Sequence, residues 1–442
     1  MIWLPEDTWI VAIGAVTAMA CALVGTFLVL RRLSLMGDAI SHAVLPGLAL
    51  GFILTGARSS GAMFAGAAVV GLLTALWTDG LTRAGRMDEG ASMGVVFTTL
   101  FALGLVLIRR AVDRHGVDID PNCVLYGALE LAPLDRVRIA GLEVPRAFAS
   151  GLGALVLNGA VIAVLFKEFR IAAFDPALAT TVGIRAGFMH ALHMSLVAVT
   201  TVAAFEAVGS ILVVAMLIVP PATALLLARR LGVVLVLSLA LAFLAAAGGH
   251  LAAITVPRLW GFQDTSTVGT MAVVSGALFG LAVLVAPHEG LVVKAIHRLG
   301  LGVQVAREDI LGHLVRAAEA GAGPVPGPEL IAAGSRAVGS AWVARRALGH
   351  LLRQGWVASE PDGIRLLDRG KAQGERIIRS HRLWETWFDR SLGLPLDHLH
   401  ATSEQLEHVT TPGMLAQLAA ETGEPARDPQ GRPIPRGEDG PA

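Results

Sequence analysis

Long apolar stretches separated by short polar loops dominate the first two thirds of the chain. Each stretch is close to the roughly 20 residues that a helix needs to cross a bilayer. A helix satisfies its backbone hydrogen bonds internally, so it is the default form of such a stretch in lipid. The pattern predicts nine membrane-spanning helices, over residues 8–30, 38–56, 61–81, 90–108, 148–166, 188–205, 208–228, 231–255 and 266–287.

Two details of this apolar pattern are informative. Pro220 and Pro221 fall late in one span, where the loss of backbone donors predicts a kink that leaves carbonyls free. Between two other spans, residues 173–187 form a short, mildly amphipathic segment that predicts a helix in the loop. From its pattern alone, this helix is either an ordinary interfacial helix or the docking point of a partner protein.

The apolar runs break up after Leu301. The periodicity then predicts helices over 308–320, 328–333 and 339–354, followed by two short strands within 355–367 around a Pro-Asp-Gly turn. Three helices followed by a hairpin are typical of a winged-helix domain. Such a domain binds DNA through its third helix or serves as a protein-contact module.

Composition supports this division into a membrane part and a soluble part. Apolar residues make up 54% of the chain, charged residues 16%, and the mean hydropathy is +0.64. These values indicate a polytopic membrane protein with an attached domain. Charge is nearly absent from the apolar runs and dense in the last third, and the two cysteines, Cys21 and Cys123, indicate no disulfide framework.

Basic residues cluster in alternate loops, which are therefore expected on the cytoplasmic side. The N-terminus is then outside and the C-terminus inside. One loop, residues 109–147, is basic although this topology makes it external, and we expect residues 124–131 within it to dip into the membrane. The cytoplasmic loops are those that carry Arg31 and Arg32, Arg83 and Arg86, Lys167, Arg170 and Arg185, Arg229 and Arg230, and Lys294 and Arg298.

Asp38 and His42 stand four residues apart at the start of the second span, which places them on one face of a helix. A carboxylate and an imidazole both bind divalent cations, and ionisable groups within an apolar span mark a candidate ion pathway. Alternatively, Asp38 caps the helix N-terminus and His42 is a hydrogen-bonded core histidine. Residue chemistry alone leaves both interpretations open.

The segment from Arg31 to Gly47, together with the run from Val208 to Pro220, resembles the membrane subunit of manganese, zinc and iron ABC importers. The resemblance covers about residues 5–290. It implies a homodimer around a central path lined by Asp38 and His42. It also implies two ATPase subunits on cytoplasmic coupling helices and an external lipoprotein or periplasmic protein that delivers the ion.

By the same resemblance, the short helix within 173–187 is the coupling helix. Two Asp38–His42 pairs in a dimer give four oxygen and nitrogen ligands, a set that suits Mn, Fe or Zn. The chain has no G-x-x-x-x-G-K-[ST] phosphate loop, so we expect a permease subunit of the bacterial inner membrane whose ATP hydrolysis is supplied by another chain. The coupling-helix residues are Asp175, Pro176, Ala179 and Gly183.

Histidines and glutamates near the C-terminus have the spacing of metal ligands. Imidazole and carboxylate without thiolate favour Mn or Fe over a structural zinc cluster. On composition alone, a solvated charged face is the alternative. The residues are His381 and Glu385, four apart on one predicted helix, and then His400, Glu404, Glu407 and His408.

These residues, with the run from Asp428 to Pro435, resemble the iron- and manganese-dependent repressors of the diphtheria-toxin type over about residues 305–436. The family's N-terminal ligands lie in or before its first helix. Here that region offers only Glu308 and Asp309, which predicts an incomplete second site. The resemblance assigns His381, Glu385 and His400 to one metal site and Glu404, Glu407 and His408 to the other, with Glu404 at the position that favours manganese.

The sequence thus predicts a mainly α protein with a transmembrane helical bundle over 1–300, a winged-helix domain over 305–375 and a helical metal-binding and dimerisation domain over 376–442. We expect the membrane subunit of an importer for Mn²⁺ or Fe²⁺, with Zn²⁺ as a further candidate, whose cytoplasmic domain senses the ion and regulates transport. One alternative is a membrane-tethered, metal-dependent DNA-binding regulator with Arg345 and Arg346 as DNA contacts. Another is a tail that is only a degenerate dimerisation module.

Overall fold

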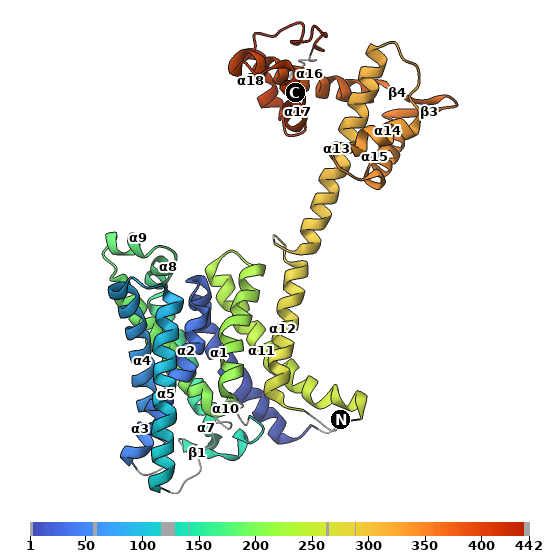
Figure 1. Cartoon of the computed structure of the whole chain (residues 1–442). Coiled ribbons are helices and arrows are strands. Elements are labelled where there is room, and N and C mark those ends of the chain that lie inside the picture. The colour runs from blue at the N-terminus through green and yellow to red at the C-terminus, as the bar shows by residue number, and fades with distance from the viewer. Residues whose placement is uncertain are drawn as a thin grey trace. The chain divides into compact units, whose positions relative to one another are not determined.

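The computed structural model divides the chain into two compact units, Met1–Val293 and Lys294–Ala442, which we call the membrane unit and the soluble unit. Helices provide nearly all regular structure in both, and the described strands form two short hairpins (Figure 1). The predicted mainly α fold is confirmed. The residues described are 3–55, 60–115, 129–139, 141–261, 265–287 and 289–436.

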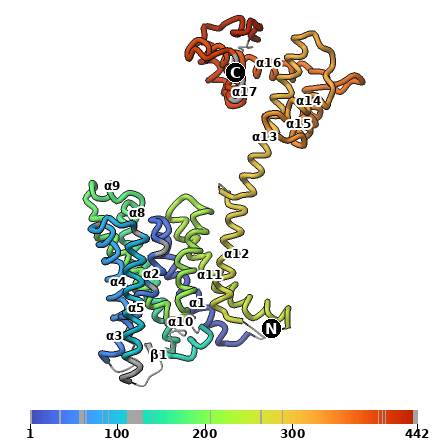
Figure 2. Tube along the Cα trace, viewed as in Figure 1, coloured from blue at the N-terminus to red at the C-terminus, as the bar shows by residue number. Residues whose placement is uncertain are grey.

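The membrane unit is a bundle of long helices, whose course is traced in Figure 2. Its elements are α1 (Pro5–Leu30), α2 (Ser34–Ala43), α3 (Leu45–Thr55), α4 (Ser60–Gly85), α5 (Glu89–His115), η1 (Ala132–Leu134), β1 (Arg136–Ile139), β2 (Leu142–Pro145), α7 (Arg146–Val164), α8 (Phe166–Phe174), α9 (Pro176–Thr181), α10 (Ala186–Leu227), α11 (Leu231–Thr255), η2 (Pro257–Trp260) and α12 (Thr267–Val285).

Within the part of the chain that the structure describes, nine helical segments are long and apolar enough to cross a membrane, as predicted. The second of them combines α2 and α3, and α10 contains two. The chain is therefore built as a multi-pass membrane protein. The segments are Pro5–Leu30, Met36–Thr55, Ala65–Thr82, Gly90–Arg110, Arg146–Val164, Ala186–Phe205, Ala207–Leu227, Leu231–Trp260 and Thr267–Val285.

Glycines allow the helices of the membrane unit to approach closely. A methyl group at Gly25 of α1 would overlap the Leu217 carbonyl of α10. Gly47 of α3 and Gly66 of α4 oppose each other in the same way. Close contact between small residues is how helices in lipid gain packing energy. The crossings of α1 with α10 and of α3 with α4 are thus among the tightest contacts of the bundle.

Helix α10 has its break at a glycine and not at the two prolines where the sequence pattern placed a kink. Gly209 has φ 69° and ψ 172°, outside the helical range, whereas Pro220 and Pro221 lie within the helix. Only glycine adopts a conformation of this kind without strain. The break lies at the third residue of the second candidate span of α10, Ala207–Leu227, close to the point where the first span ends at Phe205.

The basic loop whose path the sequence left open contains a hairpin. β1 and β2 pair in antiparallel fashion, with Arg136 opposite Pro145 and Ile139 opposite Leu142. Of the segment expected to dip into the membrane, residues 124–128 lie outside the described residues. Leu129 is fully buried in the core of the membrane unit, so this loop packs onto the helices at its C-terminal end.

The soluble unit begins with the predicted order of three helices and a hairpin. Its first helix starts earlier than the sequence indicated, because Gly300 and Gly302 do not interrupt it and α13 runs unbroken from Leu291 (Figure 1). The elements are α13 (Leu291–Glu319), α14 (Gly327–Ser335), α15 (Ala341–Arg353), β3 (Val357–Glu360), β4 (Gly363–Leu366), α16 (Asp368–Trp387), the π-helical turn η3 (Phe388–Leu392), α17 (Leu396–Glu407) and α18 (Pro412–Glu421).

Two apolar cores hold the soluble unit together. The first joins α13, α14, α15 and the hairpin through the fully buried Ile310, Leu330 and Leu351. The second lies under α16 and α18 and contains Leu383 and Leu418. Helix α16 and the chain that joins it to α18 carry the clustered histidines and glutamates, so these two cores position the polar residues described next.

Candidate metal sites

Helix α2 carries Asp38 and His42 on one face, as the spacing predicted. His42 Nε2 lies 3.4 Å from Asp38 Oδ1. The His42 side chain is 23% exposed and that of Asp38 is 50% exposed in the single chain. α2 ends directly after His42, and α3 begins two residues later. The pair therefore sits beside a break in the second span, where its oxygen and nitrogen atoms remain accessible.

Two aromatic rings of α5 pack against the His42 imidazole, and the sequence analysis did not identify them. The ring centroids of Phe97 and Phe101 lie 5.6 Å and 5.9 Å from that of His42, and Phe101 meets it edge-on at 89°. One turn further along α5, a methyl group at Gly104 would lie 2.7 Å from Leu45 Cβ. This close contact fixes α5 against the start of α3, and it thereby holds both rings on His42.

Helix α9 is the short helix expected in the cytoplasmic loop. The Asp175 carboxylate caps it by accepting hydrogen bonds from Ala177 N at 3.0 Å and Leu178 N at 2.9 Å. Ala179 is fully buried, and Gly183 has φ 86° directly after the helix. Pro176 is its first residue. The apolar side chains of Phe174, Leu178 and Val182 are 54–66% exposed on and around α9.

In the soluble unit, His381, Glu385 and His400 form one cluster. His381 Nε2 lies 3.0 Å from Glu385 Oε1 and 2.8 Å from His400 Nδ1, and the same Glu385 oxygen lies 3.2 Å from His400 Nδ1. Buried His381 and Glu385 come from α16, whereas the more exposed His400 comes from α17. The sequence assigned these three residues to one site, and the structure brings them together.

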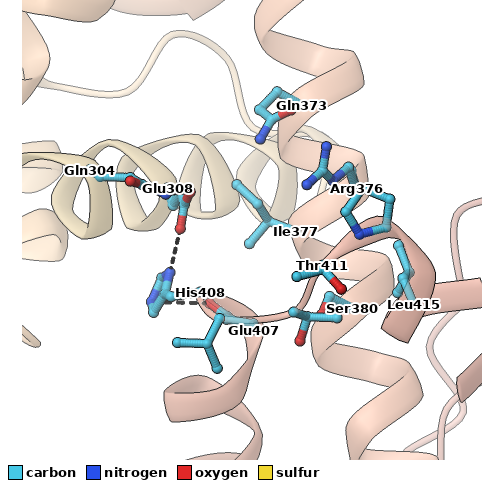
Figure 3. Close-up of a pocket in the computed structure, with 13 residues that line it drawn as sticks. Gln304, Glu308, Gln373, Arg376, Ile377, Ser380, Glu407, His408, Thr411 and Leu415 are labelled. Atoms are coloured by element: carbon cyan, nitrogen blue, oxygen red, sulfur yellow. Dashed lines mark hydrogen bonds and ion pairs between the residues drawn. The ribbon is translucent and has the colours of Figure 1, made fainter. Parts of the chain in front are cut away.

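The second cluster contains Asp309, Glu407 and His408. His408 Nδ1 lies 2.7 Å from Glu308 Oε2, and His408 Nε2 lies 3.3 Å from Asp309 Oδ1. Figure 3 shows Glu308 of α13 joined to His408 beyond the end of α17. Glu308 and Asp309 were the only candidate ligands that the sequence analysis found in this first helix. Both are in contact with His408.

Glu404, which the resemblance grouped with Glu407 and His408, takes no part in either cluster. It forms no hydrogen bond or ion pair with any residue that the structure describes. Both ring nitrogens of His408 are already in contact with acids of α13, so the imidazole has no free atom to attract Glu404. Asp309 occupies the place in the cluster that the sequence assigned to Glu404.

The Glu407 carboxylate connects the two clusters. Its Oε2 lies 2.5 Å from His381 Nδ1, and its Oε1 lies 3.8 Å from His408 Nε2. The His381 ring is therefore in contact with Glu385 on one nitrogen and with Glu407 on the other. A single carboxylate is therefore in contact with a histidine of each cluster.

Charge pairing dominates the electrostatics of these clusters. Burial alone lowers the pKa of His408, but hydrogen bonds with Asp309 and Glu308 outweigh it and raise the pKa to about 10. Burial also lowers the pKa of His381, and hydrogen bonds with Glu385 and Glu407 reverse the direction, so that the pKa is raised. Without a metal, the His408 ring therefore holds its proton at neutral pH and is a cation of the site.

The donor set fits a divalent transition metal. Asp309 Oδ2 and Glu385 Oε2 are buried and form no hydrogen bond within the described part of the chain. Buried polar atoms without partners are costly, and each of these is a metal-ligand atom of oxygen type. Each cluster has its candidate atoms within 4.8 Å of one another, close enough for one ion to contact all three.

An ion pair holds α13 onto α16 beside the first cluster. The buried Arg382 guanidinium donates two parallel hydrogen bonds to Glu319, at 2.9 Å and 2.6 Å, and a further one to the Pro433 carbonyl. Bidentate pairing of this kind fixes geometry as well as contributing energy. Helix α13 therefore contacts the metal-ligand region at both Glu319 and the Glu308–Asp309 step.

The proposed DNA-contacting residues lie on the surface of α15. Arg345 and Arg346 are exposed, and the Arg346 guanidinium lies 5.5 Å from the ring centroid of the exposed Trp342. The first turns of α15 thus present a basic and aromatic face to solvent.

Comparisons with known proteins agree with this division of the chain. The profile of the ABC 3 transport family matches residues 8–286, and that of the iron dependent repressor, metal binding and dimerisation domain matches residues 367–436. The manganese transport system membrane protein MntD of Bacillus subtilis is 40% identical over 296 residues, which cover 67% of this chain and 97% of that protein.

Two further relatives match the membrane unit. The zinc transport system membrane protein TroD of Treponema pallidum is 39% identical over 287 residues, covering 65% of this chain and 76% of that protein. The solved structure of PsaBC from Streptococcus pneumoniae in complex with Fab has a TM-score of 0.53 at 29% identity, covering 65% of this chain and 94% of that chain. Because the family match includes all but the ends of the membrane unit, the chain belongs to the ABC 3 transport family and carries a domain of the iron dependent repressor type after its last span.

Proposed function

We propose that this chain is the membrane subunit of an ATP-driven importer for a divalent transition metal, with Mn²⁺ as the first candidate and Fe²⁺ and Zn²⁺ as further ones. The observation that carries the proposal is the Asp38–His42 pair, 3.4 Å apart within a span of a chain that is 40% identical to a manganese transport membrane protein. Nitrogen and oxygen ligands suit all three metals.

A homodimer completes the transport path. The half-exposed Asp38 carboxylate leaves room for ligands from a second copy, and two pairs supply four ligand atoms. Phe97 and Phe101 hold His42 in place and keep water from one side of its ring. An ion that enters the path exchanges hydration water for these ligands, and it leaves because each copy holds it through only two residues.

ATPase subunits supply the energy and dock at α9. The exposed Phe174, Leu178 and Val182 give this helix an apolar surface, and its Asp175 cap keeps the helix formed when a partner pushes on it. The soluble unit then lies on the cytoplasmic side of the bacterial inner membrane, and a metal-binding protein delivers the ion from outside. These placements follow from the arginine-rich loops of the sequence.

The soluble unit reports the internal metal concentration to the permease. Metal at the second cluster replaces the ion pairs that His408 makes with Glu308 and Asp309 of α13. Helix α13 begins at Leu291, a few residues after α12 ends at Val285. The helix that carries Glu308 and Asp309 thus follows the last span closely in the chain, and we infer that occupied clusters slow transport.

Reconstitution tests the transport function directly. Proteoliposomes containing the chain and its ATPase subunit, with ATP on the ATPase side, are expected to accumulate Mn²⁺ in an ATP-dependent manner, and competition with Fe²⁺ and Zn²⁺ gives the order of preference. Accumulation of none of the three metals would overturn the proposal. Removing residues 305–442 is expected to preserve uptake and abolish its inhibition by metal on the cytoplasmic side.

A membrane-tethered DNA-binding regulator is the second candidate, because Arg345 and Arg346 lie exposed on α15 beside Trp342. In that case the purified chain retains double-stranded DNA in a manner that requires Mn²⁺ or Fe²⁺ and is lost in Arg345→Ala with Arg346→Ala. Phosphate contacts of this kind weaken steeply with salt. Transport without metal-dependent DNA retention excludes this candidate.

A further inference from the structure

A polar cavity of about 250 Å³ lies next to the second cluster, and its residues are not all explained by metal binding. It is bounded by α13, by α16 and by the segment that joins α17 to α18. Figure 3 shows Gln373, Arg376 and Ser380 along α16 and Thr411 at the start of α18. Residues 373, 376 and 380 are three and four apart, so they occupy one face of α16 and point to the same space.

Several donors on this wall lack an acceptor. The Ser380 side chain is only 3% exposed, yet its Oγ has no hydrogen-bond partner in the described chain. The exposed Arg376 and the partly buried Gln373 line the cavity without forming a hydrogen bond or ion pair to any residue that the structure describes. A buried hydroxyl without a partner is costly, and beside an unengaged guanidinium it indicates a missing acceptor.

The first turn of α18 faces the same cavity. Thr411 caps this helix through its hydroxyl oxygen, which accepts a hydrogen bond from Met414 N at 3.3 Å, and Thr411, Pro412 and Leu415 all line the space. The N-terminus of a helix carries a partial positive charge and favours anions. The helix end, the guanidinium and the hydroxyl therefore favour the same kind of ligand.

The two carboxylates of the cavity each have an oxygen in contact with an imidazole. Glu308 Oε2 is in contact with His408 Nδ1 at 2.7 Å, and Glu407 Oε2 is in contact with His381 Nδ1 at 2.5 Å. Each acid is thus paired with an imidazole, whereas Arg376 is paired with nothing among the described residues. The donors that remain available in the cavity belong to positive or neutral groups.

We propose that this cavity binds a small oxyanion of the phosphate or carboxylate class between Arg376, Ser380 and the first turn of α18. The site is separate from both metal clusters and does not depend on the proposed transport function. Because Glu407 and His408 line the cavity and also belong to the second cluster, a cation there and the oxyanion attract each other. Coupling between two ligands is reciprocal, so each raises the affinity of the other.

Titration calorimetry on the purified full-length chain in metal-free buffer tests the site, with inorganic phosphate and succinate as separate probes. We expect saturable one-site binding of at least one probe, and the probe that binds identifies the source of the oxyanion. Arg376→Gln is expected to weaken binding tenfold or more, since it removes a charge-assisted hydrogen bond. Ser380→Ala is expected to weaken it about fivefold by removing a single oxygen.

Arg369→Gln is the matched control, because Arg369 is exposed on the same helix and does not line the cavity. This variant is expected to bind the probe as the parent does, and thermal unfolding checks that all three variants are folded. Mn²⁺ is expected to tighten binding of the probe several-fold in the parent. The proposal is overturned if neither probe shows saturable binding, or if the Arg376→Gln and Arg369→Gln variants bind equally well. Neither result bears on the proposed transport function.

Discussion

The Asp38–His42 pair of the membrane unit and the histidine–carboxylate clusters of the soluble unit use the same two ligand types in opposite arrangements. In α2, two residues lie 3.4 Å apart and the carboxylate is half exposed. In the soluble unit, Glu385 and Glu407 are 0% and 3% exposed, and His381 and His408 are in contact with a carboxylate at both ring nitrogens.

We interpret this difference as a consequence of the two roles proposed above, transport at the Asp38–His42 pair and sensing at the clusters. A transport path must bind the ion and then release it, so few ligands and an open side suffice. A sensor must remain folded without metal and respond when metal arrives, so its ligands need partners in both states. The protonated His408 provides such a partner when metal is absent. Each of the following experiments alters either the membrane pair or the clusters of the soluble unit.

Removing the carboxylate of the membrane pair is expected to have the largest effect. Asp38→Ala deletes the only acid of the pair, and we expect uptake of Mn²⁺ to fall at least 100-fold in cells that depend on this importer. Radiolabelled Mn²⁺ uptake measures this. Asp88→Ala is the control, because Asp88 is exposed near the start of α5 and caps it locally. Import at an undiminished rate in the Asp38 variant would falsify the role of the pair.

Removing a ligand of the second cluster is expected to weaken Mn²⁺ binding to the purified chain by one to two orders of magnitude while leaving basal uptake intact. Glu407→Gln should have this effect because Glu407 contacts both clusters. Equilibrium dialysis or Mn²⁺ electron paramagnetic resonance measures the affinity. Glu404→Gln is the matched comparison and should change it less than threefold, since Glu404 joins neither cluster. Equal losses in the two variants would show that the ion draws Glu404 into the site.

The affinity of the soluble unit for Mn²⁺ is expected to depend on pH. The pKa of His408 is raised to about 10, so an incoming ion must displace a proton from this ring, and the raised pKa of His381 acts in the same direction. Each displaced proton makes binding about tenfold tighter per pH unit below the pKa. Between pH 6.5 and 7.5 we therefore expect the affinity to rise at least about tenfold. Binding that is constant over this range contradicts the protonated state of the His408 ring.

The smallest effect is expected from the aromatic wall of the membrane pair. Phe101→Leu keeps an apolar side chain but removes the edge-on contact with His42. The imidazole then samples more orientations, and we expect KM for Mn²⁺ to rise about threefold with little change in the maximal rate. Uptake kinetics separate the two parameters. A Phe101→Leu variant with lower maximal rate and unchanged KM would indicate a role in helix packing instead.

The sequence predicted which segments are helical better than it predicted where the helices begin or break. Apolar runs located the nine candidate spans found among the described residues, because the bilayer thickness imposes a length on each. The break in α10 falls at Gly209 and not at Pro220 and Pro221, because a helix accommodates proline through its neighbours whereas φ 69° requires glycine. The unbroken start of α13 at Leu291 was likewise missed, since its glycines do not stop the helix.

Some contacts between candidate ligands could be predicted from the sequence, and others could not. His381 with Glu385, and Asp38 with His42, follow from spacing, because residues four apart on a helix always share a face. Asp309 is about 100 residues from His408 in sequence, and its contact with that ring depends on how α13 packs on α16. Glu404 had the right spacing and yet stays out of the cluster, because acids from another helix already contact both nitrogens of His408.

By itself, the sequence determined the spans, the two-part organisation, the short capped helix α9 and the within-helix pairs, because helical periodicity and bilayer length are local constraints. Only the tertiary structure decided which acids reach His408, which rings pack on His42, and that Arg376 and Ser380 face one cavity. These contacts join helices that are far apart in the chain, and their geometry is set by side-chain packing that no local pattern encodes.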